Sequence, residues 1–352
     1  IVERVGKLKA RRCCGRCAQT DGALGSPSLG SVQGALGKTG REYCSEAWRF
    51  GNHLAMDTRH TPVLCNEVLH YLEPIQEGWI VDCTLNGGGH TRAILATKPK
   101  VSVLGIEWDP TIARDFVQNN TDIASRVSVV NDSYAHLPQI CAQAGVVPQA
   151  LLFDLGLSSI HYASSGRGFS FMKEDEPLDM RFNPSTVAKT AGDMVSEYTQ
   201  DELAHVGGEG GKERLADQSA AARGLARRTA PFRTVADLVR AIEGAVPGWY
   251  RHRKLHCATK TFQALRVAVN DELGNVQKGL EAAIDVVAPG GRILVISFQG
   301  AEDKIARELF KAQVKLGRIT WVTRATIRPA WSEIEQNPRA RSAKLKIIQR
   351  CL

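Results

Sequence analysis

The sequence lacks any apolar stretch long enough to cross a lipid bilayer. A membrane-spanning helix needs about 20 consecutive apolar residues, and polar or charged residues interrupt every apolar run before that length. We therefore expect no membrane partner. The sequence also has no G-x-x-x-x-G-K-[ST] phosphate loop, and its glycine-rich loop at 86–91 does not match the dinucleotide fingerprint G-x-G-x-x-G. The loop alone therefore does not identify a ligand.

The chain has no ordered set of cysteines. Its nine cysteines are spaced irregularly over 352 residues, which is not the pattern of a disulfide framework. This usage is typical of a reducing compartment, and we expect the protein to be cytoplasmic. Cys13, Cys14 and Cys17 contain one C-x-x-C pair, with no second pair at the spacing of a zinc site. We predict no metal site.

Residues 1–55 differ in composition from the rest of the chain. They carry nine Lys and Arg against four Asp and Glu, although the formal charge of the whole chain is only +8. The stretch from Gly22 to Gly40 is rich in Gly and Ser without an apolar period, which predicts disorder. The first methionine is Met56. We interpret 1–55 as a non-native extension before a start at Met56; the alternative is a basic transit segment, which would make the protein mitochondrial.

Short apolar runs alternate with helical patterns in the remainder, which predicts a parallel α/β sheet. The expected strands are 79–82, 101–107, 127–130, 150–154 and 292–298. More than 130 residues separate the last two, which is too long for one crossover. Because 186–268 is rich in Ala, Glu, Leu and Arg at helical spacing, we predict an all-helical domain inserted there, between core parts 56–185 and 269–352.

Polar residues follow three of these strands. The loop Asn86–His90 comes after the first strand, Glu107 ends the second, and Asp154 ends the fourth. Ligands of open α/β sheets bind at the carboxyl ends of the strands, so these residues are expected to face one crevice. A glycine loop, a carboxylate for ribose hydroxyls and a later aspartate are the layout of an S-adenosylmethionine-dependent methyltransferase. The alternative is an ordinary doubly wound domain whose glycines only turn the chain.

Further ordered blocks resemble the RsmH (MraW) family, the 16S rRNA (cytosine-N4)-methyltransferases. They are His60–Leu64, Arg167–Phe171, Pro177–Arg181, Thr259–Arg266, Val269–Leu273, Pro289–Arg292, Ile296–Phe298 with Glu302 and Asp303, and Asn337–Leu345. The resemblance covers roughly residues 60 to 350. It implies a Rossmann-like class I methyltransferase core and N4-methylation of a cytidine near the decoding centre of the small ribosomal subunit. It also implies S-adenosylmethionine as cofactor and 16S rRNA as partner, and a homodimer is compatible with it.

The resemblance assigns cofactor contacts, each with a structural alternative. Gly88, Gly89 and His90 would wrap the methionine part, although His90 could instead cap the following helix. Glu107 would bind the ribose, where the family more often has aspartate, or it could be a solvent-facing strand end. Asp109 is expected to be a helix cap. The remaining cofactor assignments are Tyr134, against adenine or in the core; Asp154; and His161, where relatives often have glutamine. Either Asp154 or a nearby backbone carbonyl is expected to accept the amine proton.

Other residues are candidates for contact with RNA. Phe169 or Phe171 would stack on the target cytosine. The segment 248–256 places basic side chains around two aromatic ones, and Arg251, Arg253 and Lys254 would neutralise phosphates unless this is a solvated loop. The resemblance also suggests phosphate or base contacts that could equally be structural ion pairs, at Arg167, Arg181 and Arg266.

Two departures from the family pattern keep a second function open. Gln299-Gly300-Ala301 stands where relatives read His-Ser-Leu, and Gly207–Gly211 places four glycines inside a predicted helix, which we expect to break it. The alternative is therefore a catalytically weakened methyltransferase fold that binds RNA in ribosome assembly. A small-molecule methyltransferase is disfavoured by the large basic insertion.

Overall fold

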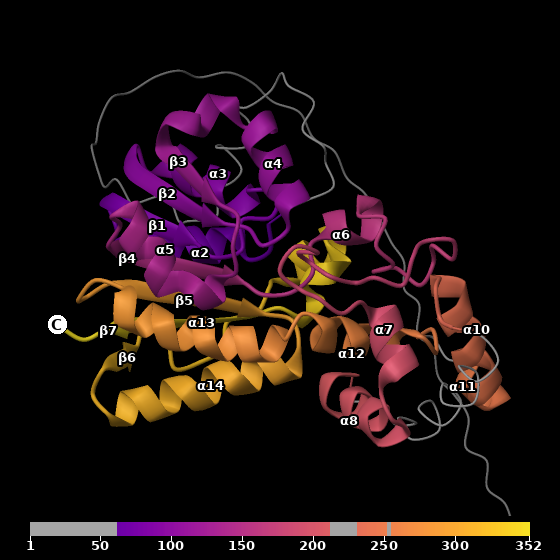
Figure 1. The fold of residues 1–352 in the computed structure, drawn as a ribbon. Coiled ribbons are helices and arrows are strands. Elements are labelled where there is room, and N and C mark those ends of the chain that lie inside the picture. Colours follow the sequence, from indigo (N-terminus) through magenta and orange to yellow (C-terminus); the bar gives the residue numbers. More distant parts are fainter. Residues whose placement is uncertain (1–61, 212–230, 252–254) are drawn as a thin grey trace, which may run out of the picture. The chain divides into compact units, whose positions relative to one another are not determined.

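The computed structural model describes residues 62–211, 231–251 and 255–352, and the predicted N-terminal extension 1–55 lies outside these ranges. The described chain forms one sheet of seven strands in the order β3-β2-β1-β4-β5-β7-β6 (Figure 1). The strands are β1 (Glu77–Asp82), β2 (Lys100–Ile106), β3 (Val127–Val130), β4 (Pro148–Asp154), β5 (Arg292–Ser297), β6 (Ile319–Trp321) and β7 (Lys344–Arg350). No helix in the described ranges is long and apolar enough to cross a membrane.

The sheet reverses its direction of growth between β1 and β4. Strands β1 to β5 are mutually parallel, and β1 pairs with both β2 and β4. The chain therefore builds outward to β3, returns past β1 and continues on the other side, which leaves a crevice at the carboxyl ends of these strands. The five predicted strands are confirmed to within about two residues at each end.

Strands β6 and β7 were missed by the sequence analysis. Strand β7 inserts between β5 and β6 and runs antiparallel to both. It carries two lysines, and Lys346 is nevertheless buried because its ammonium contacts Asp303. Strand β7 was missed because the charged Lys346 at an inward position interrupts its apolar pattern. Strand β6 was missed because it has only three residues.

Helices cover both faces of the sheet because successive strand residues point to opposite sides. Val81 and Leu151 pack beneath one set of helices, whereas their neighbours Ile80 and Leu152 pack beneath the other. The first face is covered by α5 (Leu137–Ala144), α13 (Glu272–Val286) and α14 (Gly300–Lys315). The second is covered by α2 (Cys65–Leu72) and α3 (Gly89–Thr97). The predicted α/β class is thus confirmed.

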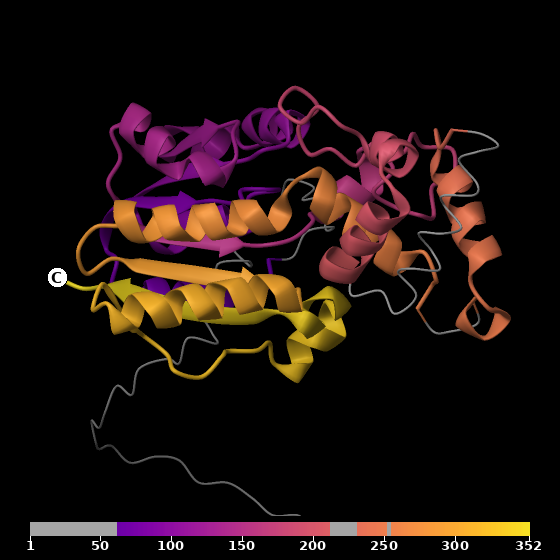
Figure 2. The same ribbon diagram turned by 60° about the horizontal axis from the view of Figure 1, so that its bottom comes forward.

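Helices between β4 and β5 gather beyond the carboxyl ends of the strands (Figures 1 and 2). They are α7 (Ala191–Glu197), α8 (Gln200–Gly211), α10 (Val235–Ala245), α11 (Gly248–Arg251) and α12 (Thr259–Val269). They share a hydrophobic core of their own, which Phe169, Leu178 and Met180 also join. The second core therefore begins earlier in the chain than the predicted boundary at 186.

The predicted break at Gly207–Gly211 is wrong. Helix α8 continues through these glycines to Gly211. It packs along α12, and tertiary contacts of this kind outweigh the low helix propensity of glycine.

Candidate active site

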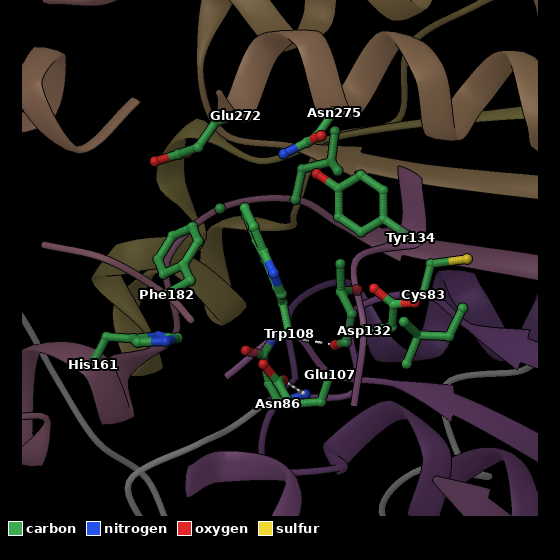
Figure 3. Close-up of a pocket in the computed structure, with 14 residues that line it drawn as sticks. Cys83, Asn86, Glu107, Trp108, Asp132, Tyr134, His161, Phe182, Glu272 and Asn275 are labelled. Atoms are coloured by element: carbon green, nitrogen blue, oxygen red, sulfur yellow. Dashed lines mark hydrogen bonds between the residues drawn. The ribbon is translucent and has the colours of Figure 1, made fainter. Parts of the chain in front are cut away.

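A cavity opens at the carboxyl ends of β1, β2 and β3, beside the loop that follows β4. It encloses about 570 Å³, counting the part open to solvent. Figure 3 shows its lining, with Glu107 and Asn86 at one end and Glu272 and Asn275 at the other. The lining residues are Cys83, Thr84, Asn86, Ile106, Glu107, Trp108, Asp132, Tyr134, Leu155, Gly156, His161, Phe182, Glu272 and Asn275. We call this space the small cavity.

Glu107 lies at one end of the small cavity and is buried, with 6 % of its surface exposed. The backbone N–H groups of Asn86 and Asp109 donate to its two oxygens, at 2.9 and 2.8 Å. Burial raises the pKa of Glu107 to about 7, although the two backbone hydrogen bonds lower it. The alternative of a solvent-facing strand end is wrong. The remaining lone pairs of this fixed carboxylate can accept hydrogen bonds from the hydroxyl groups of a ligand.

Aromatic rings form the walls of the small cavity. Tyr134, which begins the 3₁₀ helix η2 (Tyr134–His136), meets Phe153 edge to face, with centroids 5.6 Å apart. It is therefore both a partly buried core residue and a cavity residue. Trp108 meets Phe182 in the same way at 5.8 Å. These rings give a slot that suits a flat heterocycle.

The sequence analysis did not single out every residue of this cavity, and Trp108 and Asp132 are two that it missed. Trp108 follows Glu107 directly, and Asp132 comes two residues after β3 ends at Val130. Asp132 accepts a hydrogen bond from His136 at 2.8 Å and can accept one from an exocyclic amine. The signal that could have found Asp132 is the one that identified Glu107, namely an acidic residue at the carboxyl end of a strand.

The glycine loop is shaped by packing as well as by any ligand. Gly88 has φ +74°, and a Cβ atom there would lie 2.1 Å from the Phe116 ring. A Cβ atom at Gly89 would meet Pro62 at 3.1 Å. Gly88 is the N-cap of α3, so the alternative that His90 caps this helix is wrong. His90 instead lies 2.9 Å from the Val63 carbonyl oxygen through Nε2.

The cofactor contacts of the three loop residues stay predictions. Asn86 lines both cavities and Gly87 lines the larger one described below, whereas Gly88, Gly89 and His90 line neither. The backbone of Asn86 and Gly87 is therefore the part of the loop nearest to a ligand.

Asp154 ends β4 and faces a second, larger space. Its backbone N–H donates to Thr84 Oγ1 at 2.7 Å, and its Oδ2 lies 3.7 Å from His90 Nδ1. Its Oδ1 is buried without a hydrogen-bond partner among the described residues. Burial raises the pKa of Asp154 to about 6; His90 lowers it, and Asp82 raises it further. One carboxylate oxygen is thus free to accept a hydrogen bond from a substrate.

The larger space is a groove between the core and the helical insertion. It is lined from the core by Asp154, the loop that follows it, β5's end and the 3₁₀ helix η3 (Pro338–Ser342), and from the insertion by α12. The groove and the small cavity share Asn86, Leu155 and Gly156 as lining residues. The two spaces are therefore neighbours, and Asp154 stands where they meet.

His161 lies on α6 (Ser159–Ser164) and points into the small cavity, with 5 % of its surface exposed. Its Nε2 is 3.1 Å from Asp109 Oδ2. Burial lowers the pKa of His161, although Asp109 raises it in part, so the ring is neutral at physiological pH. Asp109 accepts a hydrogen bond from Thr111 N–H at 2.9 Å at the start of α4 (Pro110–Asn119), which confirms the predicted cap.

Of the two phenylalanines predicted to stack on cytosine, only one is accessible. Phe169 also borders the groove, but it is only 4 % exposed, and its ring is stacked on Phe182 with centroids 5.6 Å apart. Phe171 is partly exposed and lines the groove, with one face stacked on His256 at 4.7 Å. The prediction stays open for Phe171, whereas the core of the insertion covers Phe169.

The structure favours the ion-pair alternative for the predicted RNA-binding arginines. Arg181 pairs with Asp179 at 2.7 Å, and Arg266 pairs with Glu272 at 2.5 and 2.9 Å. Arg167 contacts the Asp109 carboxylate in the same way. Among the residues of the predicted basic segment, Arg251 is exposed at the end of α11, whereas Arg253 and Lys254 lie outside the described residues.

Within the ranges that the structure describes, one group of side chains has metal-ligating atoms close together. These atoms, from Glu243, His256 and Cys257, lie within 4.8 Å of one another. His256 Nδ1 accepts a hydrogen bond from the Ala258 N–H at 3.2 Å, and its Nε2 lies 3.6 Å from Glu243. Both ring nitrogens therefore have partners without an ion.

Comparisons with known proteins agree with the geometry. Residues 57–351 match the model of the MraW methylase family. Three similar curated proteins are named "Ribosomal RNA small subunit methyltransferase H". That of Synechococcus elongatus is 40 % identical over 83 % of this chain and 95 % of its own length. Those of Dictyoglomus thermophilum and Kosmotoga olearia are 38 % and 39 % identical, over 84 % and 83 % of this chain and 98 % and 97 % of their own lengths. The resemblance seen in the sequence is confirmed: the chain belongs to the MraW methylase family.

Proposed function

We propose that this protein transfers a methyl group from S-adenosylmethionine to N4 of a cytidine in 16S rRNA, near the decoding centre of the small ribosomal subunit. The family membership and the name of the relatives support the substrate class. The observation that carries the proposal is the buried Oδ1 of Asp154, which has no hydrogen-bond partner in the described part of the chain and stands where the small cavity meets the groove.

The small cavity fits the nucleoside half of the cofactor. Glu107 accepts hydrogen bonds from ribose hydroxyls, the rings of Tyr134 and Trp108 enclose the adenine, and Asp132 accepts from its amino group. When bound, S-adenosylmethionine supplies an electrophilic methyl group on a positively charged sulfur. Burial lowers the pKa of His161, which favours its uncharged form in the lining of this cavity.

Asp154 then acts on the nucleotide in the groove. The exocyclic amine of cytosine becomes positively charged as it attacks, and it must lose a proton. Asp154 Oδ1 accepts that N–H, while the hydrogen bond between its backbone and Thr84 fixes the end of β4. Above a pH of about 6 the carboxylate is ionised and can take the proton.

The insertion between β4 and β5 serves as the substrate-recognition domain in this proposal. We assign residues 186–268 to it, together with the preceding segment around Phe169, Leu178 and Met180 that shares its hydrophobic core. The rest of 56–185 and residues 269–352 form the catalytic core. Phe171 stacks on a base, and Arg251, Arg253 and Lys254 contact phosphates. In this proposal the reaction takes place in the cytoplasm. The small ribosomal subunit is the partner, and two copies of the chain can form a homodimer.

The test is methylation of defined RNA. We would incubate the full chain with isotopically labelled S-adenosylmethionine and small subunits that lack the modification, and then analyse nucleosides by mass spectrometry. Labelled N4-methylcytidine is expected with the wild-type chain, and a loss of at least two orders of magnitude with Asp154→Asn. RNA binding without any methylated cytidine would contradict the proposal and favour a binding role in ribosome assembly.

A further inference from the structure

We propose that Arg339 binds a backbone phosphate of the RNA strand beside the target cytidine, and that Tyr162 holds its guanidinium in position. The Arg339 guanidinium carbon lies 5.9 Å from the centre of the Tyr162 ring. Both residues line the groove that contains Asp154. This inference rests on the proposed function and names the contact that fixes the strand in that groove.

The fold brings these two side chains to the catalytic edge of the sheet from distant parts of the chain. Tyr162 lies on α6, directly after the loop that follows Asp154; its neighbour His161 is buried, whereas Tyr162 is 39 % exposed. Arg339 lies on η3, which leads into β7, and the first residue of β7 pairs with Ser297 at the end of β5. Both therefore stand at the edge where β4 and β5 end.

The backbone beneath Arg339 is firmly held. Ala340 and Ala343 are fully buried, and the Asn337 side chain accepts a hydrogen bond from the Arg339 N–H at 3.2 Å. Arg339 itself is exposed. A rigid support with a projecting guanidinium reduces the conformational entropy that is lost when a ligand binds.

The charge of Arg339 is not neutralised within the described part of the chain. No carboxylate there lies within ion-pair distance of it, whereas the other groove arginine, Arg266, is paired with Glu272. Lys260, on the insertion side of the groove, has no ion pair among the described residues either. A guanidinium that lies over an aromatic ring and has no ion pair among the described residues is suited to an RNA phosphate.

In this proposal the ligand that occupies the groove is a single-stranded segment of RNA. The N4 amine of a paired cytosine is engaged in the base pair, so the nucleotide must leave a helix before it reaches Asp154. Its flanking phosphates then lie along the groove, where Arg339 and Lys260 face them from opposite sides.

The test compares two arginines of the same helical turn. Arg339 and Arg341 are both exposed residues of η3, but only Arg339 lines the groove. We would measure Kd of the full chain for small-subunit rRNA across a salt series. Arg339→Gln is expected to weaken binding about tenfold, as for the loss of one charge-assisted hydrogen bond. It should also reduce the slope of log K against log salt by about 0.7, the value for one contact to a single strand. Arg341→Gln should match the wild type.

Removal of the Tyr162 ring should change RNA affinity but not its salt dependence, because this residue only positions the guanidinium of Arg339. Tyr162→Phe keeps the ring and should retain wild-type affinity, whereas Tyr162→Ala should weaken binding with little change in salt slope. Arg339→Lys should retain the slope. Cofactor affinity and thermal midpoint should be unchanged in all variants.

Equal Kd and salt slope for Arg339→Gln and Arg341→Gln would overturn the phosphate contact. A loss of affinity in Tyr162→Phe equal to that in Tyr162→Ala would overturn the role of the ring. A wild-type chain that binds the RNA but never methylates it would overturn the proposed function alone, because the binding data decide on Arg339 independently.

Discussion

At the scale of single residues, Asp154 combines burial with an incomplete set of hydrogen bonds. Its pKa is about 6 in the folded chain, against 3.8 for an ordinary aspartate. The folded state therefore binds this proton more tightly than the unfolded state, and ionisation of Asp154 lowers the free energy of unfolding as the pH rises from about 4 to 6. The side chain proposed to accept the amine proton is thus destabilising at neutral pH, as is common at active sites.

The first prediction follows from this pKa. With cofactor and RNA both saturating, the single-turnover rate should rise with pH through about 6 and level off above it, because only ionised Asp154 accepts the proton. Saturating cofactor is needed because the pKa of Glu107 is about 7. Asp154→Asn should lose this pH dependence, turn over about 10² to 10⁴ times more slowly, and melt at a higher temperature than the wild type at pH 8. A wild-type rate that does not change between pH 5 and 8 would refute the assignment.

At the scale of elements, the glycine loop joins β1 to α3 through two left-handed residues, Asn86 with φ +49° and Gly88. Gly88 has φ +74°, and the Phe116 ring fills the space where its Cβ would be. Gly89 is the first helical residue of α3, and a Cβ atom there would lie 3.1 Å from the Pro62 ring. Adjacent glycines therefore have different reasons to be glycine.

The second prediction separates these two positions. Gly88→Ala should lower the free energy of unfolding by about 1 to 3 kcal/mol, since it adds both backbone strain and a steric clash with Phe116. Gly89→Ala is the matched control and should cost less than about 1 kcal/mol, because Pro62 needs to move by only a few tenths of an ångström. Denaturant unfolding measures both values. A cost for Gly89→Ala equal to that of Gly88→Ala would refute the distinction.

At the scale of the whole molecule, a buried ion pair joins the insertion to the core. Arg266 belongs to α12 and Glu272 to α13, and their side chains are 8 % and 10 % exposed. Removing one partner leaves the other charge buried and uncompensated, whereas replacing both with apolar residues removes that cost.

The third prediction is that Glu272→Gln lowers the free energy of unfolding by about 3 to 5 kcal/mol. The double variant Arg266→Met with Glu272→Leu should regain most of this loss. Lys189→Met breaks the exposed pair with Glu197 and serves as the control, with an expected cost below about 1 kcal/mol. If both single variants cost the same in denaturant unfolding, the buried pair does not link the two cores.

The sequence alone determined the features that depend on neighbouring residues. Five strands, the polar residues at their ends and the helical character of the insertion were all predictable because hydrophobic periods and strand ends are local patterns. Glu107 and Asp154 were found in this way, since each directly ends an apolar run. The resemblance of ordered blocks then identified the family, which the geometry of a site cannot do on its own.

The tertiary structure decided everything that requires a distant partner. Strand β7 is stable inside the sheet only because β5 and β6 flank it and Asp303 neutralises Lys346. In the same way, the burial of Asp154 sets its pKa and its free oxygen, and the cation–π contact of Arg339 joins residues 177 positions apart. Desolvation and charge pairing depend on what surrounds a group in space, and the order of residues along the chain does not specify that directly.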